Sequence, residues 1–150
     1  MSTFGRRGAP RDLGSVAVEF VLLLPMLLAL IGLVVGGARV WWTRTGVQQL
    51  ASSAARAASI ARTAGEARAT AESLVRGDAV NSDLRCMAGW PRTTIDTSGF
   101  AAPLGTPARV TVRVSCTVPL SDLLLPGLPG SFLVEADAQS PLDRYRMRRP

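Results

Sequence analysis

Residues 14–38, GSVAVEFVLLLPMLLALIGLVVGGA, decide the fold of this chain. No charged residue occurs from Phe20 to Ala38, and a helix over that run measures about 28 Å, close to the hydrocarbon thickness of a bilayer. We therefore expect a transmembrane helix over residues 15–40. One carboxylate, Glu19, lies at the start of the run. An unpaired charge buried there would cost on the order of a few kcal/mol, so Glu19 requires either a partner or a position from which it reaches the headgroups.

The residues before this run form a short basic leader, residues 1–14. It contains Arg6, Arg7 and Arg11 against Asp12, and arginines next to a membrane helix favour the cytoplasmic side. We expect a cytoplasmic N-terminus and an exported C-terminal part. The apolar run is longer than that of a secretory signal peptide, and it continues directly into a helical pattern, so cleavage after it is not expected.

The outer end of the apolar run is rich in amphipathic side chains. Tryptophan rings lie at the headgroup level of membranes and arginines extend toward it, which predicts a membrane interface formed by Arg39, Trp41, Trp42 and Arg44. Beyond it, apolar residues, mostly alanines, recur at three- and four-residue steps and predict one amphipathic helix over residues 41–77. Gly77 is expected to end that helix.

The rest of the chain is predicted to form turns and strands. Residues 78–141 are punctuated by glycine and proline, with strands expected at 93–97, 108–118 and from 132 onward. The strand over 108–118 alternates valine with polar residues and is the clearest one. The leucines of 119–130 are expected to cap the core, although a contact with a membrane or a neighbour is an alternative. Residues 142–150 are expected to form a frayed basic tail.

Two cysteines, Cys86 and Cys116, both follow the membrane segment. An even pair on the exported side of a membrane suggests a disulfide, and two free buried thiols are the alternative. Together these features predict an α+β protein. It has one long N-terminal helix, first transmembrane and then amphipathic, and a small antiparallel sheet folded against its outer half.

Composition argues against catalysis and against nucleic-acid binding. The 17 basic residues are all arginine and are spread along the chain against 11 acidic residues, and there is no histidine. A histidine-based triad or histidine metal site is therefore excluded, and two cysteines do not make a zinc site. We expect no enzymatic activity, no cofactor, no metal and no nucleic-acid partner.

The start of the mature helix resembles a class III prepilin signal. The residues GSVAVEF, 14–20, place Glu19 five positions after Gly14 and follow it with Phe20. With the apolar span, the Ala- and Arg-rich helix and the C-terminal strands, the chain resembles the TadE-like family of the tight-adherence (Tad) pilus and secretion system. That resemblance implies a pilin-like fold and cleavage between Gly14 and Ser15 by a prepilin peptidase. It also implies that the new Ser15 amine pairs with Glu19 of an adjacent subunit.

The resemblance also implies a role and partners. The major pilins of that system are shorter, so this chain is expected to be a minor pilin or pseudopilin. Its expected partners are the prepilin peptidase, other Tad/Flp pilus subunits, the inner-membrane assembly platform and membrane lipid. The alternative is a single-pass membrane-anchored exported domain unrelated to pili, in which Gly14 and Glu19 are coincidental.

Overall fold

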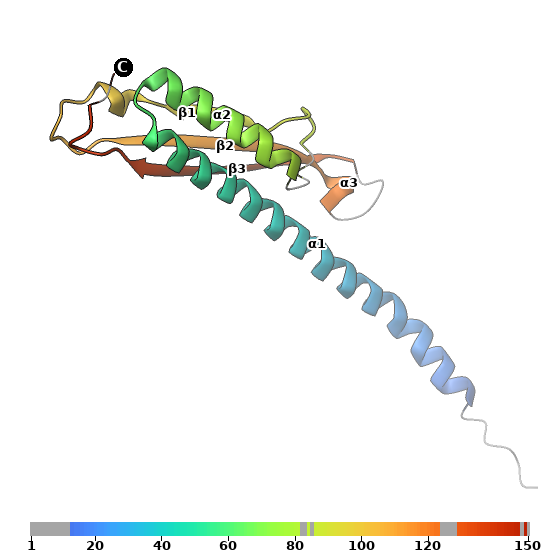
Figure 1. Ribbon diagram of the computed structural model, residues 1–150. Coiled ribbons are helices and arrows are strands. Elements are labelled where there is room, and N and C mark those ends of the chain that lie inside the picture. The colour runs from blue at the N-terminus through green and yellow to red at the C-terminus, as the bar shows by residue number, and fades with distance from the viewer. Residues whose placement is uncertain (1–12, 82–83, 85, 124–128, 148, 150) are drawn as a thin grey trace, which may run out of the picture.

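The computed structural model of the protein describes residues 13–81, 84, 86–123, 129–147 and 149. In chain order the elements are α1 (Leu13–Ile60), α2 (Ala64–Asn81), β1 (Arg92–Asp96), the 3-10 helix η1 (Ser98–Ala101), β2 (Arg109–Pro119), α3 (Leu120–Leu123) and β3 (Ser131–Pro141). The first half of α1 projects alone, and its second half packs with α2 and the sheet (Figure 1). The predicted α+β fold, with one long N-terminal helix and a small antiparallel sheet, is confirmed.

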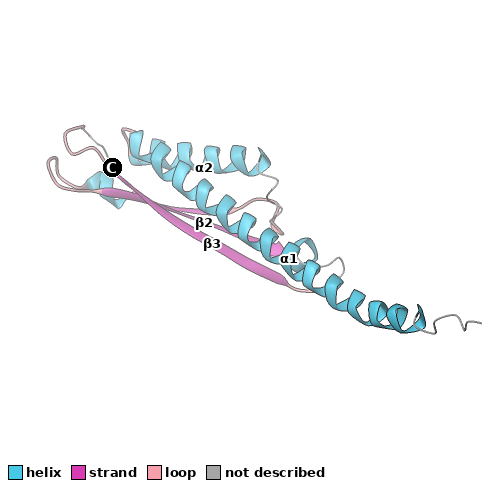
Figure 2. Cartoon of the chain, turned by 90° about the horizontal axis from the view of Figure 1, so that it is seen from below, coloured by secondary structure: helices cyan, strands magenta, loops and turns pink. Residues whose placement is uncertain are grey.

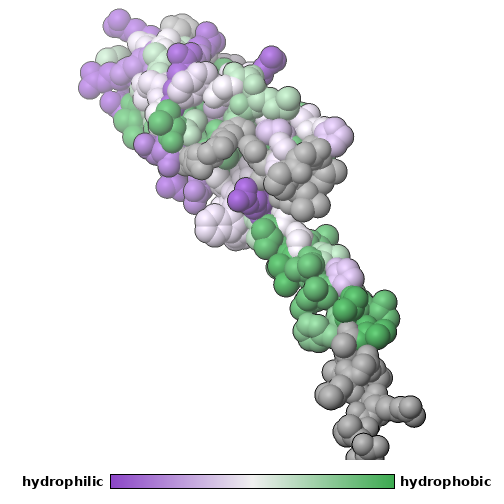
Figure 3. Space-filling model, turned by 90° about the vertical axis from the view of Figure 1, so that its right-hand side faces the viewer, coloured by the Kyte–Doolittle hydropathy of each residue, from purple (hydrophilic) through white to green (hydrophobic). Residues whose placement is uncertain are grey.

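The described chain has two parts, a stalk and a head. The stalk is residues 18–38 of α1, and the head is the described part of the chain from Val47 onward. In the space-filling view the stalk is largely green, the colour of hydrophobic residues, whereas most of the strongly hydrophilic purple surface lies higher on the head (Figure 3). The protein therefore consists of an apolar rod joined to a small polar-surfaced body.

The sheet is a three-stranded antiparallel meander with β2 in the middle. Val112 of β2 pairs with Ile95 of β1 on one side and Ala138 of β3 on the other. The alternating residues of β2 that the sequence placed on one face are all at most 5% exposed: Val110, Val112, Val114, Cys116 and Val118. The strand predicted over 108–118 is confirmed, as are those predicted near 93–97 and from 132 onward.

Helices α1 and α2 lie together on one face of this sheet (Figure 2). The buried face of α1 consists of Val47, Leu50, Ala51, Ala54, Ala55 and Ala58, and that of α2 of Ala67, Ala71, Val75 and Ala79. Alanine has the smallest apolar side chain, so these faces let the helices approach the valines of β2 closely. Phe100 of η1, 2% exposed, is the largest fully buried side chain in this core.

The predicted single helix over 41–77 is wrong, because the chain reverses inside it. Helix α1 ends at Ile60, α2 begins at Ala64, and α2 runs back along α1 (Figure 1). Helix α2 also continues through Gly77 to Asn81. The alanine spacing remains helical across the turn, but one straight helix would carry its second half off the sheet. Folding back places both alanine faces on the same core.

The start of α2 is fixed by a capping arrangement. The Thr63 hydroxyl accepts a hydrogen bond from the Glu66 backbone N–H at 3.1 Å. The Glu66 carboxylate in turn accepts one from the Arg62 backbone N–H at 3.0 Å. The first bond satisfies an N–H group that the first turn of a helix leaves without a partner, and the second ties the residue before Thr63 to that turn. The sequence Thr-x-x-Glu at 63–66 is the local signal for this new helix start.

The described part of the C-terminal tail, residues 142–147 and 149, packs on the head and is not frayed. Arg149 donates its backbone N–H to the Arg62 carbonyl at 3.1 Å. The Arg146 guanidinium donates to the Ile60 carbonyl at 2.9 Å. Ile60 is the last residue of α1, where a cation is favoured by the negative end of the helix dipole. The prediction of a frayed tail is therefore wrong, because these residues close the α1–α2 turn.

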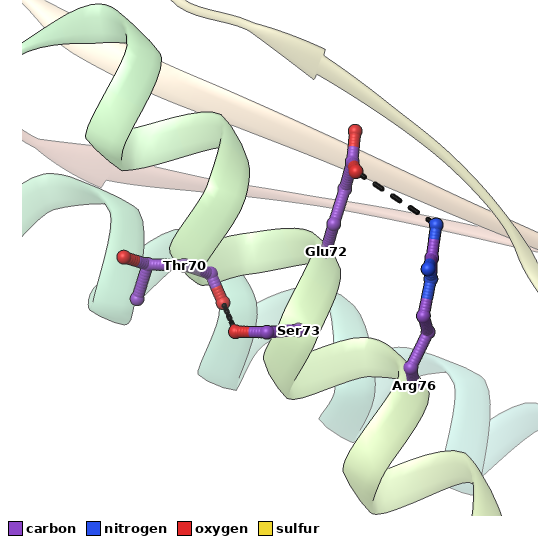
Figure 4. Close-up of polar contacts among 4 residues, drawn as sticks. All are labelled: Thr70, Glu72, Ser73 and Arg76. Atoms are coloured by element: carbon purple, nitrogen blue, oxygen red, sulfur yellow. Dashed lines mark hydrogen bonds and ion pairs between the residues drawn. The ribbon is translucent and has the colours of Figure 1, made fainter.

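The outer surface of α2 carries polar side chains (Figure 4). Glu72 and Arg76, one helical turn apart, form an ion pair of 4.0 Å, and Ser73 donates to the Thr70 carbonyl at 2.9 Å. Both members of the ion pair are more than half exposed, so it contributes about 0.3–0.5 kcal/mol at most. This face of α2 is an ordinary solvated surface.

Candidate functional site

The environment of helix α1 differs between its two halves. The large apolar side chains of the stalk are between 45% and 74% exposed, whereas Val47 is fully buried. Within the described part of the chain, α1 is the one helix long and apolar enough to cross a membrane. The stalk therefore presents its apolar side chains outward, away from any core of the chain itself.

Glu19 lies at the far end of the stalk. Its side chain is exposed, and no described residue forms a hydrogen bond or ion pair with its carboxylate. The next charged residue along α1 is Arg39, about 30 Å further along the helix axis at 1.5 Å per residue. The two charges thus bracket a length that matches a bilayer core.

The predicted cleavage site lies at the first turn of α1. The helix begins at Leu13, so the backbone of Gly14 and Ser15 is already helical. Leader residues 1–12 lie outside the described residues. Phe20, the aromatic residue of the motif, is 67% exposed, so this end of α1 offers a ring and a carboxylate that the described residues do not bury.

The four residues predicted at a membrane interface lie at the junction between stalk and head. Trp41 and Trp42 are 65% and 73% exposed, and both Arg39 and Arg44 are exposed. They follow the last residue of the stalk and precede Val47, the first fully buried side chain in the packed half of α1. Their position is the one that an interface role requires.

Side-chain hydrogen bonds and a ring contact hold this junction. The Thr43 and Thr45 hydroxyls each donate, at 3.0 Å, to the carbonyl four residues earlier, so these polar groups are satisfied inside the helix. The Arg44 guanidinium carbon lies 5.4 Å from the centroid of the Phe132 ring, within the range of a cation–π contact. Phe132 is part of β3, and its pairing with Arg44 was not foreseen from the sequence.

The two cysteines lie at disulfide distance, with 5.3 Å between their Cα atoms. Cys116 points into the core and is 1% exposed, and Cys86 is 9% exposed. The adjacent Met87 backbone N–H donates to the Thr117 carbonyl at 2.7 Å. The segment after α2 is thus held against the middle strand by a backbone hydrogen bond as well as by the approach of the two sulfurs.

The predicted site residues therefore fall into separate groups. Gly14, Ser15, Glu19 and Phe20 share one end of α1, and the arginines and tryptophans of the junction lie a membrane thickness away. The cysteines lie in the head. No group of three or more His, Cys, Asp or Glu side chains that could hold a metal occurs among the described residues.

One family model matches the segment that contains the motif, the stalk and the junction. Residues 14–56 match the model of the TadE-like protein family. The TadE-like match confirms the resemblance noted from residues 14–20 and relates the chain to the Tad pilus system. It begins at Gly14 and covers 43 of the 150 residues, ending on the packed half of α1. Helix α2 and the sheet lie outside it. The chain matches no curated protein and no solved structure.

Proposed function

We propose that this protein is a TadE-like minor pilin, or pseudopilin, which acts in assembly of a Tad type IV pilus or secretion system at the bacterial cell envelope. One observation carries the proposal. The TadE-like match starts at Gly14, five positions before Glu19, on a helix that then exposes apolar side chains over about 28 Å.

The proposed topology is a single pass through the inner membrane. The arginines of the leader keep the N-terminus in the cytoplasm, and Trp41 and Trp42 lie at the outer headgroup layer. The head is then extracytoplasmic. A Cys86–Cys116 disulfide fits this assignment, because disulfides persist in exported compartments and the two Cα atoms are 5.3 Å apart.

Glu19 guides assembly in this proposal. Prepilin peptidase cuts after Gly14 and frees the Ser15 amine. In the low dielectric of the membrane, that amine is attracted to Glu19 of a neighbouring pilus subunit and fixes the register of the added chain. The exposed Glu19 carboxylate, which has no partner among the described residues of its own chain, supports a partner on another subunit.

The protein acts by assembly and has no catalytic role in this proposal. Its partners are the prepilin peptidase, other Tad/Flp pilus subunits, the assembly platform of the inner membrane and lipid. The absence of histidine from the sequence supports this, since it removes the commonest general acid and base.

A substitution of Glu19 tests the assembly role. Glu19→Ala makes the apolar segment more hydrophobic, so the variant inserts into the membrane at the wild-type level but is lost from pili sheared from the cell. Glu72→Ala, which removes an exposed glutamate of the head, is the matched control and keeps normal incorporation. Normal incorporation of Glu19→Ala would contradict the amine pairing and favour a plain membrane anchor.

A further inference from the structure

Several separate segments meet at the end of the head from which the stalk emerges. A Cβ atom added to Gly46 would lie 3.7 Å from the Cδ atoms of Leu84, so the segment after α2 packs directly on α1 there. Gly46 follows Trp42 by four residues, which is about 6 Å along the helix axis. The end of α2 and the residues after it therefore lie just above the tryptophans of the junction.

The sheet reaches the same level. The Arg44–Phe132 contact places the start of β3 beside the junction. Thr117, which accepts the Met87 backbone N–H, is paired with Leu133 across β2 and β3. The segment after α2, the end of β2 and the start of β3 thus all reach the end of the head at which α1 leaves it.

Large apolar side chains from four of these segments are exposed at this level, each by more than half. They are Trp41 and Trp42 of α1, Val80 of α2, Met87 and Trp90 of the following segment, and Leu133 of β3. We call these six residues the rim. Val80 and Trp90 are neighbours, since they line one shallow hollow together with Leu84. In Figure 3 the green stalk meets the head beside pale residues and a strongly hydrophilic purple patch.

We propose that the rim rests in the interfacial layer of the phospholipid bilayer that the stalk enters, so that the head lies on the membrane surface. The inference rests on the proposed membrane insertion of the stalk. Because α1 is one continuous helix, inserting it up to Trp41 and Trp42 brings the Gly46–Leu84 contact to about one helical turn above those tryptophans, and Val80 and Trp90 lie beside Leu84. Tryptophan is favoured in that layer, and apolar side chains there leave water.

Lipid is the occupant to which the geometry points, because the rim is continuous with the stalk. The rim lies at the end of the head from which an apolar helix emerges, and it includes the tryptophans at the boundary of that helix. Met87 and Trp90 follow Cys86, where the segment is held to β2 by the approach of the two cysteines and by the Met87–Thr117 hydrogen bond. The head thereby holds apolar side chains from different parts of the chain at one height.

Tryptophan fluorescence of the full chain in nanodiscs of phosphatidylethanolamine and phosphatidylglycerol tests this proposal. The chain has three tryptophans, so the variant Trp41→Phe/Trp42→Phe retains Trp90 alone. Lipids brominated near the headgroup end of the acyl chain quench tryptophans in the interface. We expect these lipids to quench Trp90 in the first variant about as strongly as they quench Trp41 and Trp42 in the variant Trp90→Phe. We expect aqueous iodide to quench all three tryptophans only weakly.

A matched control reports on the opposite end of the head. Leu104 is 57% exposed and follows η1, the gold segment at the end far from α3 in Figure 1. Leu104→Trp in the background with all three tryptophans changed to Phe should respond to iodide and not to brominated lipid. Leu133→Trp in the same background places a tryptophan in the rim on β3. It tests the rim independently if the variant Trp41→Phe/Trp42→Phe does not fold.

Three results would overturn the proposal, and they differ in whether the membrane insertion of the stalk is also contradicted. If Trp90 and the tryptophan at 133 respond to iodide like the Leu104→Trp control, while Trp41 and Trp42 are quenched by brominated lipid, the stalk is inserted but the rim is in water. If they are shielded from both quenchers, a protein surface covers the rim. If brominated lipid quenches none of these tryptophans, the stalk is not inserted and the membrane anchoring fails as well.

Discussion

The Arg44 guanidinium carbon lies 5.4 Å from the centroid of the Phe132 ring. This contact joins the last exposed turn of α1 before the core to the first residues of β3. It adds a contact at the junction to the packing of the second half of α1 on the sheet. A rotation of α1 about its axis would move the guanidinium off the ring.

A double-mutant cycle on this pair should show a modest coupling. Arg44→Ala removes the cation, and Phe132→Leu keeps an apolar side chain but removes the ring. We expect a coupling free energy of about 0.5–1 kcal/mol, the magnitude of an exposed cation–π contact. Urea unfolding of the chain in detergent, followed by circular dichroism, measures it. Strictly additive single and double variants would show that the contact contributes nothing.

Gly99 should not tolerate a side chain. A Cβ atom there would collide with the Arg109 carbonyl oxygen at the start of β2. Gly99→Ala should therefore destabilise the head by about 1–3 kcal/mol, the usual cost of a steric insertion into packed structure. Equilibrium unfolding provides the measurement, and unchanged stability would show that the approach of the two backbones is not obligatory.

Gly77 provides the opposite case and serves as the control for Gly99. It lies inside α2, where an added Cβ would meet nothing within 4 Å. Gly77→Ala should raise stability by about 0.5–1 kcal/mol, because alanine restricts the unfolded chain and favours helix. A loss of stability in Gly77→Ala would indicate that the outer face of α2 has a contact of its own.

The cap of α2 should contribute measurably to the α1–α2 turn. Thr63→Ala removes the hydroxyl that accepts the Glu66 N–H and should cost about 1 kcal/mol. Ser73→Ala is the control, since it removes a hydroxyl that bonds only within the exposed face of α2 and should leave stability nearly unchanged. Equal effects of the two substitutions in urea unfolding would argue against a specific role for the cap.

The cysteine pair should give a larger effect. Cys86 and Cys116 are 30 residues apart in sequence, and the chain-entropy model assigns about 3–4 kcal/mol to a cross-link that closes such a loop. The variant Cys86→Ser should lose stability of that order relative to the oxidised protein, and reduction of the wild type should lower it comparably. Intact mass under non-reducing conditions checks the bond directly: a protein from native membranes with two free thiols would contradict it.

The parts of the fold that local pattern controls could be predicted from the sequence. The alternation from Val110 to Val118 identified β2 and its buried face, since each residue of a strand faces the side opposite to its neighbours. The charge-free run after Glu19 likewise identified the helix long and apolar enough to cross a membrane. Both patterns repeat over many residues and therefore outweigh local exceptions.

The errors arose where tertiary contacts override local pattern. Ala61 and Ala64 continue the helical spacing across the α1–α2 turn, so periodicity alone concealed the reversal, although Thr63 and Glu66 carried a capping signal. The tail was mispredicted because Arg146 and Arg149 bond to backbone carbonyls more than 80 residues away in sequence. No local feature of a basic segment distinguishes that docking from solvation.

Some residues of the candidate site could likewise be predicted from the sequence, and others could not. Glu19 and the tryptophans of the junction were identified from composition and spacing along one helix. The contact of Arg44 with Phe132, and the placing of Trp90 beside the end of α2, depend on the folded sheet. Such contacts between distant segments leave no periodic trace in the sequence.

The N-terminal residue of the protein from native membranes tests the central claim most directly. Mass spectrometry of the intact chain and of its N-terminal peptide would be compared between cells with and without the prepilin peptidase. A pilus subunit should begin at Ser15 in the presence of the peptidase and retain residues 1–14 in its absence, and Gly14→Leu should retain them in both. A leader retained in wild-type cells would contradict the assignment and leave a plain membrane-anchored domain.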